Sequence, residues 1–176
     1  MTDNVGIRVI GPDDAARLER LFYRLSPESV YRRFLTLYTT PPPGVFCKLI
    51  EVDHDTRDAA VAVVGDEIVG VGRYAADPRE PGAAEVAVVV DDAWQGRGLG
   101  PRLLALAAGL ARLHGYRTLT AVVLADNAPA VRMLRRAFPD ATWRLEGGEY
   151  EVRVPLRAAE RSGGRPGERS DERVPA

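Results

Sequence analysis

The residues best suited to chemistry form a glycine-rich loop, Gln95-Gly96-Arg97-Gly98-Leu99-Gly100, between an apolar run and a helical pattern. Glycines let backbone N–H groups approach a ligand without a Cβ in the way. A helix N-terminus adds unpaired N–H groups and partial positive charge, so the combination favours a bound phosphate, with Arg97 as a charge-assisted partner. Neither the Walker A motif nor the dinucleotide fingerprint G-x-G-x-x-G fits this spacing. A purely structural turn is the alternative.

Glu85 is the second candidate, because it alone interrupts the apolar stretch Ala84–Val90 just before the loop. A carboxylate rarely occupies such a strand unless it is paired or functional. Beside a reactive acyl group, it can take the proton that an amine must lose before attack, since the pKa of lysine is about 10.4. An ion pair with Arg73 across the sheet is the structural alternative.

Other reactive side chains have simpler explanations. We expect His54 to be a solvated loop residue and His114 to end a helix, where a cation interacts favourably with the dipole. Tyr74 and Tyr150 are expected in core or strand-pair positions, and Cys47 is expected to be a small buried residue. One cysteine and two histidines make a metal site improbable.

Composition excludes several classes of function. The chain has 176 residues, 45% hydrophobic and 28% charged, which is typical of one soluble domain. A net charge of −1 argues against nucleic acid as a partner. No stretch reaches the roughly 18 apolar residues of a membrane span, and the first residues lack a signal-peptide pattern. The expected location is therefore the cytoplasm.

Alternating periodicities predict a mixed α/β domain around one sheet. The predicted strands are Gly6–Ile10, Ala59–Val64, Ile68–Tyr74, Ala84–Val90, Thr118–Leu124, Thr142–Glu146 and Tyr150–Leu156. The predicted helices are Asp13–Arg24, a second one capped by Ser26, Pro101–Leu113 and Ala128–Ala137. The domain is assigned to residues 1–156, and the polar, glycine-containing segment 157–176 is predicted to be a disordered tail.

The loop and the order of elements resemble the GNAT superfamily of acyl-CoA-dependent N-acetyltransferases, whose signature is Q/R-x-x-G-x-G/A. The resemblance implies one domain with a mostly antiparallel sheet flanked by helices, and acetyl-CoA as co-substrate. It assigns the pyrophosphate to the loop, the pantetheine arm to the preceding strand, and a cofactor contact to the later Asn-x-x-Ala motif. The cofactor-binding residues so implied are Gln95, Gly96, Arg97, Gly98, Gly100, Val88, Val90 and Asn127.

Three positions depart from the family pattern. Pro101 removes one N–H group from the helix start. Leu134 stands where the family often has a tyrosine that protonates the leaving thiolate, and Phe138-Pro139 replaces a usual Gly-Phe. Leu134 cannot donate a proton to the thiolate, so it conflicts with the family's general-acid step but not with the fold.

A closer resemblance, to bacterial protein-lysine acetyltransferases of the Pat type, is carried by Leu25–Phe34 (L-S-P-E-S-V-Y-R-R-F), by Val52–Asp55 and by Ala84–Ala87. It implies Glu85 as general base and a lysine of an acyl-CoA synthetase as acceptor. A small-molecule amine is a second acceptor class. A non-catalytic acyl-CoA sensor is a third hypothesis, favoured by Leu134.

Overall fold

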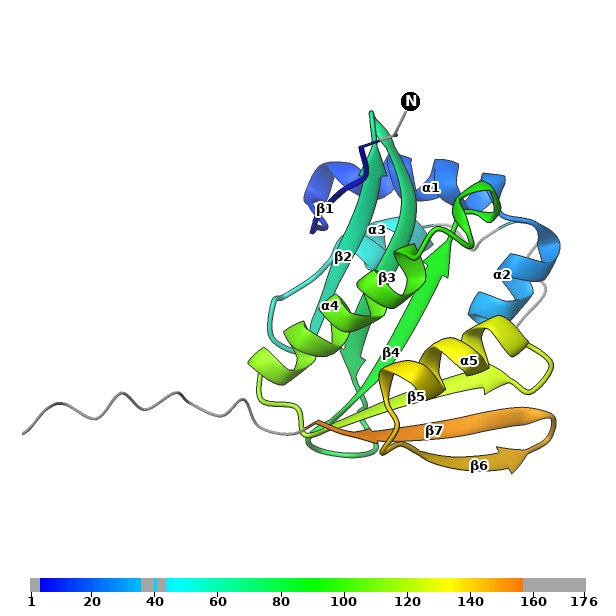
Figure 1. Ribbon diagram of the computed structural model, residues 1–176. Helices are drawn as coiled ribbons and strands as arrows, with labels where there is room; N and C mark the ends of the chain where they lie inside the picture. Colours follow the sequence, from blue (N-terminus) through cyan, green and yellow to red (C-terminus); the bar gives the residue numbers. More distant parts are fainter. Residues whose placement is uncertain (1–3, 36–39, 41–43, 157–176) are drawn as a thin grey trace, which may run out of the picture.

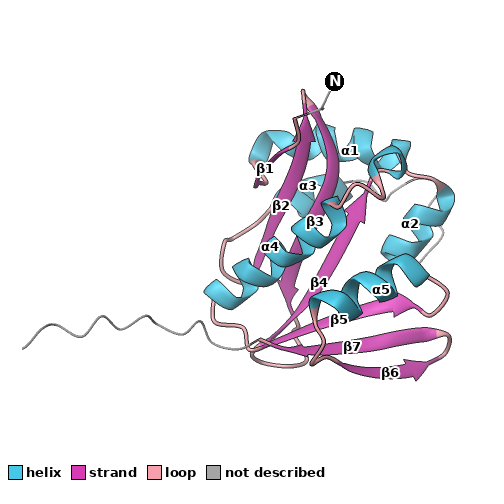
Figure 2. Cartoon of the chain, in the orientation of Figure 1, coloured by secondary structure: helices cyan, strands magenta, loops and turns pink. Residues whose placement is uncertain are grey.

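The structure is a computed structural model that describes residues 4–35, 40 and 44–156. The predicted tail, 157–176, lies outside the described residues. One twisted sheet forms the centre of the domain, with α1 and α3 on one face and α4 and α5 on the other (Figures 1 and 2). The strands are β1 (Gly6–Val9), β2 (Arg57–Val64), β3 (Glu67–Ala76), β4 (Ala83–Val90), β5 (Thr118–Leu124), β6 (Thr142–Glu146) and β7 (Glu149–Pro155). The helices are α1 (Ala15–Arg24), α2 (Pro27–Phe34), α3 (Val45–Ile50), α4 (Leu99–Leu113) and α5 (Ala128–Ala137), with short 3-10 turns η1 (Pro12–Asp14) and η2 (Asp92–Trp94).

The sheet confirms the predicted mixed, mostly antiparallel architecture. Its strand order is β1-β2-β3-β4-β5-β7-β6, and all neighbours are antiparallel except β4 and β5. That parallel pair spans only Ala83–Glu85 against Thr118–Thr120, whereas β5 pairs with β7 along its whole length. The strands β4 and β5 therefore separate after one short ladder.

Local signals explain most helix boundaries. Ser26 caps α2 by accepting a hydrogen bond from the Ser29 N–H at 3.2 Å, as the sequence predicts. Helix α4 begins at Leu99, two residues before the predicted start, because Gly98 caps it in a left-handed conformation (φ 78°). Pro101 is thereby accommodated in the first turn, where it interrupts no helical hydrogen bond.

The sequence pattern misses α3, whose six residues are too few to display a helical period. Its Phe46 and Leu49 pack against the core formed by α1 and the sheet. The expectation that Cys47 is buried is wrong: the helix turns Cys47 outward, and its side chain is exposed.

Two glycines of β3 let α4 lie against the sheet. A Cβ added at Gly72 would lie 2.5 Å from the backbone oxygen of Leu103, and one at Gly70 would lie 2.9 Å from the Leu103 side chain. Leu103 is fully buried. This close approach sets the distance between α4 and the sheet. It thereby also sets the position of the glycine loop, from which α4 begins.

Gly72→Ala is therefore expected to lower the free energy of unfolding by about 1–3 kcal/mol, because α4 must move away from β3. Urea titration followed by circular dichroism measures the change. Gly109→Ala is the matched control, since a Cβ there meets nothing within 4 Å and alanine is the better helix former. Equal stability of the Gly72 variant and the unmodified chain would contradict the packing argument.

Candidate active site

The separation of β4 and β5 opens a slot through the sheet. Its empty volume is about 850 Å³, including space open to solvent. The walls come from five elements: β4 (Glu85–Val88), β5 (Ala121–Val123), α5 with its N-cap (Asn127, Ala130, Met133, Leu134), α2 with its C-cap (Arg32–Leu35) and Leu104 of α4. Helix α2 borders the slot from one side of the sheet and α5 from the other, so the slot joins the two faces.

At every second residue of β4, the backbone N–H and C=O groups point into this slot. The Asp91 N–H donates to the Val69 carbonyl of β3 at 3.0 Å, so odd-numbered residues direct their backbone groups toward β3. Val86, Val88 and Val90 must then direct theirs toward the edge that β5 leaves. The Val90 carbonyl confirms this direction, because it accepts a hydrogen bond from the Gln95 side chain at 3.1 Å.

The glycine loop is shaped for an anion. Gly96 and Gly98 both have left-handed backbone conformations (φ 74° and 78°), which other residues adopt only with strain. The N–H groups of Gly98, Leu99 and Gly100 lie in the first turn of α4, where no helical carbonyl can accept from them. The guanidinium of Arg97 lies 4.5 Å above the Trp94 ring, a cation–π contact that holds it beside the loop.

Two acidic residues fasten the loop to the N-terminal helices. Asp91 is buried, receives the Arg24 Nε–H at 2.8 Å and accepts from the Ala93 N–H at 3.0 Å. Asp92 accepts from the Ser26 N–H and hydroxyl, both at 2.9 Å, and from the Ser29 hydroxyl at 2.8 Å. Burial opposes ionisation of Asp92, but these hydrogen bonds prevail and lower its pKa. The serines of the L-S-P-E-S motif thus dock α2 against the loop.

Glu85 lies on the face of the sheet opposite α4, at the start of the slot. Its side chain is exposed, and β4 alternation places it on the same face as Ala87 and Val89. Its carboxylate favours the charged forms of Arg33 in α2 and Arg73 in β3, which both stand close enough for this attraction. The ion pair between Glu85 and Arg73, the structural alternative to a catalytic role, is absent from the salt bridges among the described residues.

Asn127 and Leu134 line the α5 side of the slot. Asn127 caps α5 by accepting from the Ala130 N–H at 3.3 Å, which is the structural role that the sequence predicts for it. Leu134 is buried in the core that contains Val86 and Val123. The polar residues among the described lining of the slot are Arg32, Arg33, Glu85 and Asn127, so none supplies a tyrosine hydroxyl near Leu134.

The remaining reactive side chains make structural contacts. His54 pairs with buried Asp58 at 3.1 Å. Tyr74 is fully buried, its hydroxyl lies 3.0 Å from the Asp55 carbonyl and 2.5 Å from His114 Nδ1, and burial raises its pKa. Tyr150 packs edge-on against Trp143. In the described part of the chain, no three metal-ligating side chains gather, and no helix is long and apolar enough to span a membrane.

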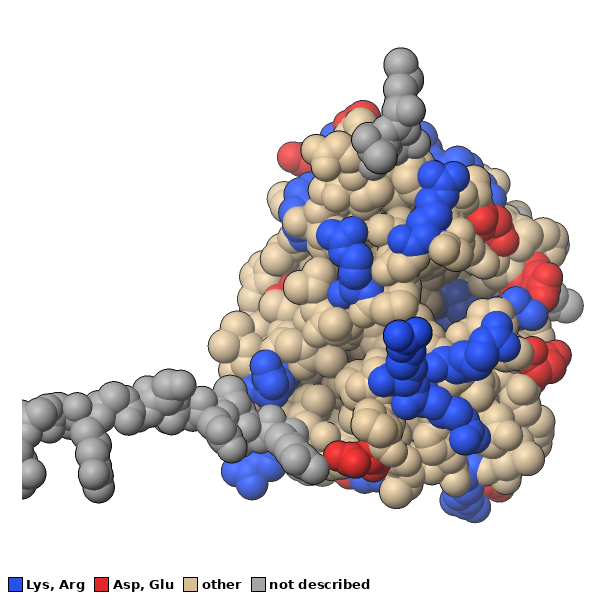
Figure 3. Space-filling view, in the orientation of Figure 1, with Lys and Arg blue, Asp and Glu red and all other residues tan. Residues whose placement is uncertain are grey.

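Basic side chains gather around the entrance on the α4 and α5 face, where Figure 3 shows a hollow bordered by lysine or arginine on several sides. Helix α5 carries three exposed arginines that sequence reasoning did not single out, Arg132, Arg135 and Arg136, of which Arg135 stacks over the Trp143 ring of β6 at 4.7 Å. The spacing of Arg132 and Arg136 was the available signal, since residues four apart lie on one helix face.

Comparisons with known proteins agree with this geometry. The profile described as the acetyltransferase (GNAT) family matches residues 18–138, so the chain belongs to that family. It is 34% identical to acetyltransferase PA5475 of Pseudomonas aeruginosa over 128 residues, which cover 70% of this chain and 68% of that protein. It is 29% identical to acetyltransferase Pat of Mycolicibacterium smegmatis over 142 residues, which cover 80% of this chain but only 42% of that longer protein.

Solved structures give the same picture. The GNAT domain of S. lividans PAT superposes with a TM-score of 0.77 at 30% identity, covering 85% of this chain and 89% of that one. The yncA protein of Salmonella typhimurium, solved with acetyl-CoA, has a TM-score of 0.71 over 88% of this chain and 95% of its own. At 18% identity, it supports the fold alone.

Arg97→Ala is expected to raise the dissociation constant of coenzyme A, the ligand that the loop predicts, about tenfold, because one charge-assisted contact to its phosphates is lost. Isothermal titration calorimetry measures this constant. Arg112→Ala removes an exposed arginine from the far end of the same helix and should leave affinity unchanged. Equal losses of coenzyme A affinity in both variants would show that binding depends on the net charge of the protein and not on a contact made by Arg97.

Proposed function

We propose that this chain transfers the acetyl group of acetyl-CoA to a lysine side-chain amine of a protein. The slot between β4 and β5 carries the proposal, because Glu85 and the free edge of β4 border it, and β4 runs on toward the glycine loop at the start of α4. A long cofactor can be anchored at the loop while its reactive end reaches Glu85. An acceptor can then approach from the face that α2 borders.

The loop and β4 supply the binding contacts. N–H groups at the start of α4, together with Arg97, receive the pyrophosphate. The outward backbone groups of Val88 and Val90 pair with the amide groups of the pantetheine arm, which takes the place of the missing strand. An N–H group of this edge also stabilises the negative charge that develops on the thioester oxygen during attack. Asn127 contacts the arm where it passes α5.

Glu85 acts as the general base. Its exposed carboxylate takes one proton from the incoming ammonium, directly or through one water, and the neutral nitrogen attacks the thioester carbon. The C–N bond forms, the C–S bond breaks, and coenzyme A leaves as the thiolate, while the nitrogen loses its second proton to solvent water to give the neutral amide. Since Leu134 cannot donate a proton, solvent water protonates the thiolate after it leaves.

The lysine acceptor rests on the relatives named Pat. The GNAT domain of S. lividans PAT and this chain match over nearly their whole lengths. The L-S-P-E-S motif, typical of that group, has a defined role here, since Ser26 and Ser29 hold Asp92 beside the loop. An acyl-CoA synthetase is therefore the acceptor protein to test.

Glu85→Gln is expected to lower kcat about 10²- to 10⁴-fold while the dissociation constant of acetyl-CoA stays unchanged, because the loop is intact. Release of coenzyme A thiol in the presence of an acyl-CoA synthetase measures the rate, and calorimetry measures affinity. Glu19→Gln, at an exposed position of α1, is the matched control and should keep full activity.

Undiminished turnover in the Glu85 variant at every pH would remove it from the role of base. Binding of acetyl-CoA without turnover on any protein or small amine would instead identify a sensor, and the proposed transferase activity would be wrong. Modification of a small amine but of no protein would replace the acceptor while preserving the chemistry.

A further inference from the structure

A second hollow adjoins the slot on the face that carries Glu85. It lies between α1, α2, α3 and the strands β3 and β4, and its empty volume is about 500 Å³, including space open to solvent. Arg33, Phe34 and Ala87 line both spaces, so the two are continuous. Ala87 follows Glu85 by two residues on the same face, a separation of about 7 Å along the strand.

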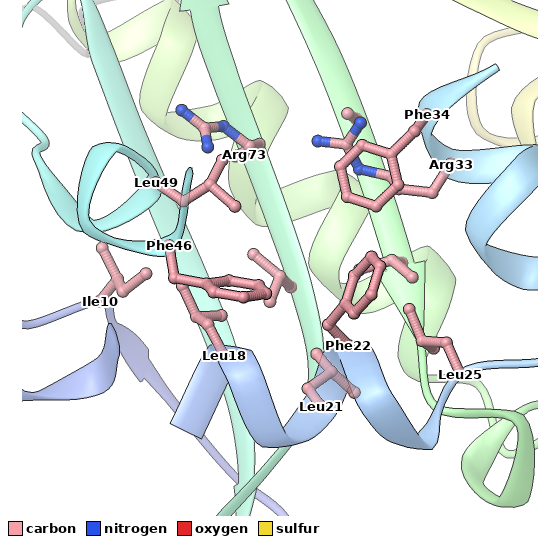
Figure 4. A pocket seen from close by; sticks show the side chains of 13 residues that line it. Ile10, Leu18, Leu21, Phe22, Leu25, Arg33, Phe34, Phe46, Leu49 and Arg73 are labelled. Atoms are coloured by element: carbon pink, nitrogen blue, oxygen red, sulfur yellow. The ribbon is translucent and has the colours of Figure 1, made fainter. Parts of the chain in front are cut away.

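The hollow has an apolar end and a cationic end. Phe22, Phe46, Leu18 and Leu21 form the apolar part, whereas the guanidinium groups of Arg33 and Arg73 lie together at the other end (Figure 4). Among the described residues, neither guanidinium takes part in a hydrogen bond or salt bridge; Arg33 only packs over the Phe34 ring at 4.9 Å. Arginines elsewhere on this face behave differently, since Arg17, Arg20 and Arg24 all pair with carboxylates.

The electrostatics of this end favour an added anion. Burial, and to a lesser degree the neighbouring Arg73, lower the pKa of Arg33 to about 10, although Glu85 opposes the change. Burial likewise lowers the pKa of Arg73. Both groups remain cationic at neutral pH, so two partly desolvated positive charges face one carboxylate. A bound anion would relieve their repulsion and replace lost hydration.

We propose that this hollow binds a free α-amino acid with a large apolar side chain and that the chain acetylates its α-amino group. The order of chemistry along the site matches that ligand: a base at Glu85, cations for a carboxylate beside it, and apolar walls for a side chain beyond. An α-amino acid carries its amine and carboxylate on one carbon, as this arrangement requires. A protein lysine carries no carboxylate next to its amine.

The inference rests on the acetyl transfer proposed above and adds a second acceptor class to it. One proton of the ammonium group passes to Glu85, the neutral nitrogen forms the new C–N bond as the thioester C–S bond breaks, and the second proton is lost from nitrogen to solvent as the amide forms. The products are the N-acetyl amino acid and coenzyme A, whose thiolate takes a proton from water. No further reactant is needed.

Matched amines test the inference with the unmodified chain. L-Leucine and L-phenylalanine are compared with their decarboxylated counterparts, isoamylamine and phenethylamine, and with glycine, using mass spectrometry of the acetylated products. We expect kcat/KM for leucine to exceed that for isoamylamine at least tenfold, because the carboxylate contact is lost. It should exceed that for glycine by a similar factor, because glycine leaves the apolar end empty.

Arginine variants locate the carboxylate site. Arg33→Gln and Arg73→Gln should each lower the ratio of kcat/KM for leucine to that for isoamylamine at least tenfold, mainly through the KM for leucine. Arg112→Gln, at an exposed position on α4, should leave this ratio unchanged. Equal kcat/KM values for leucine and isoamylamine, or ratios that neither arginine variant alters, would overturn the inference.

An acyl-CoA synthetase incubated with the same preparation separates the two proposals. Acetylated synthetase without N-acetyl-leucine or N-acetyl-phenylalanine would overturn the amino-acid acceptor and support the lysine acceptor. Acetylated amino acid without acetylated synthetase would support the amino-acid acceptor and overturn the lysine acceptor. Neither product, with acetyl-CoA shown to bind, would overturn both.

Discussion

The short parallel ladder between β4 and β5 governs the rest of the structure. Because pairing stops after Glu85, the outward backbone groups of β4 need another partner, and a slot remains through the sheet. Strand β5 can leave β4 because β7 satisfies its other edge from Thr118 to Leu124. Leu134 of α5 packs with residues of both strands, so the core itself holds them apart. An extended ligand that adds itself to β4 would complete the sheet.

The loop beyond β4 depends on contacts that are distant in sequence. Arg24 binds Asp91, and Ser26 and Ser29 bind Asp92, so the end of α1 and the start of α2 both fix the turn that precedes the glycines. The same junction sets the position of α2, whose Arg33 borders the site. The positions of the glycine loop and of α2 are therefore coupled through one pair of aspartates.

Local patterns predicted the loop, the order of the strands along the chain and the caps at Ser26 and Asn127, because glycine spacing, apolar alternation and N-cap residues act within a few positions. They failed where geometry is tertiary. Arg33 and Arg73 are 40 residues apart, and only packing of α2 against β3 and β4 brings both beside Glu85. The exposure of Cys47 likewise followed from the direction in which a six-residue helix faces, which its sequence alone does not set.

Leu134 makes the chemistry depend on a single proton-handling group. In the slot as described, Glu85 is the one carboxylate, and it lies on the acceptor face, whereas Leu134 lies on the α5 side. Proton removal and thiolate departure are therefore separated in space, and no side chain near Leu134 returns the proton. The pKa of a thiol is close to neutral pH, about 8.5 for cysteine, so the thiolate can leave without being protonated first. In the proposed transfer, deprotonation of the amine is then the step that requires a base, which is the role we propose for Glu85.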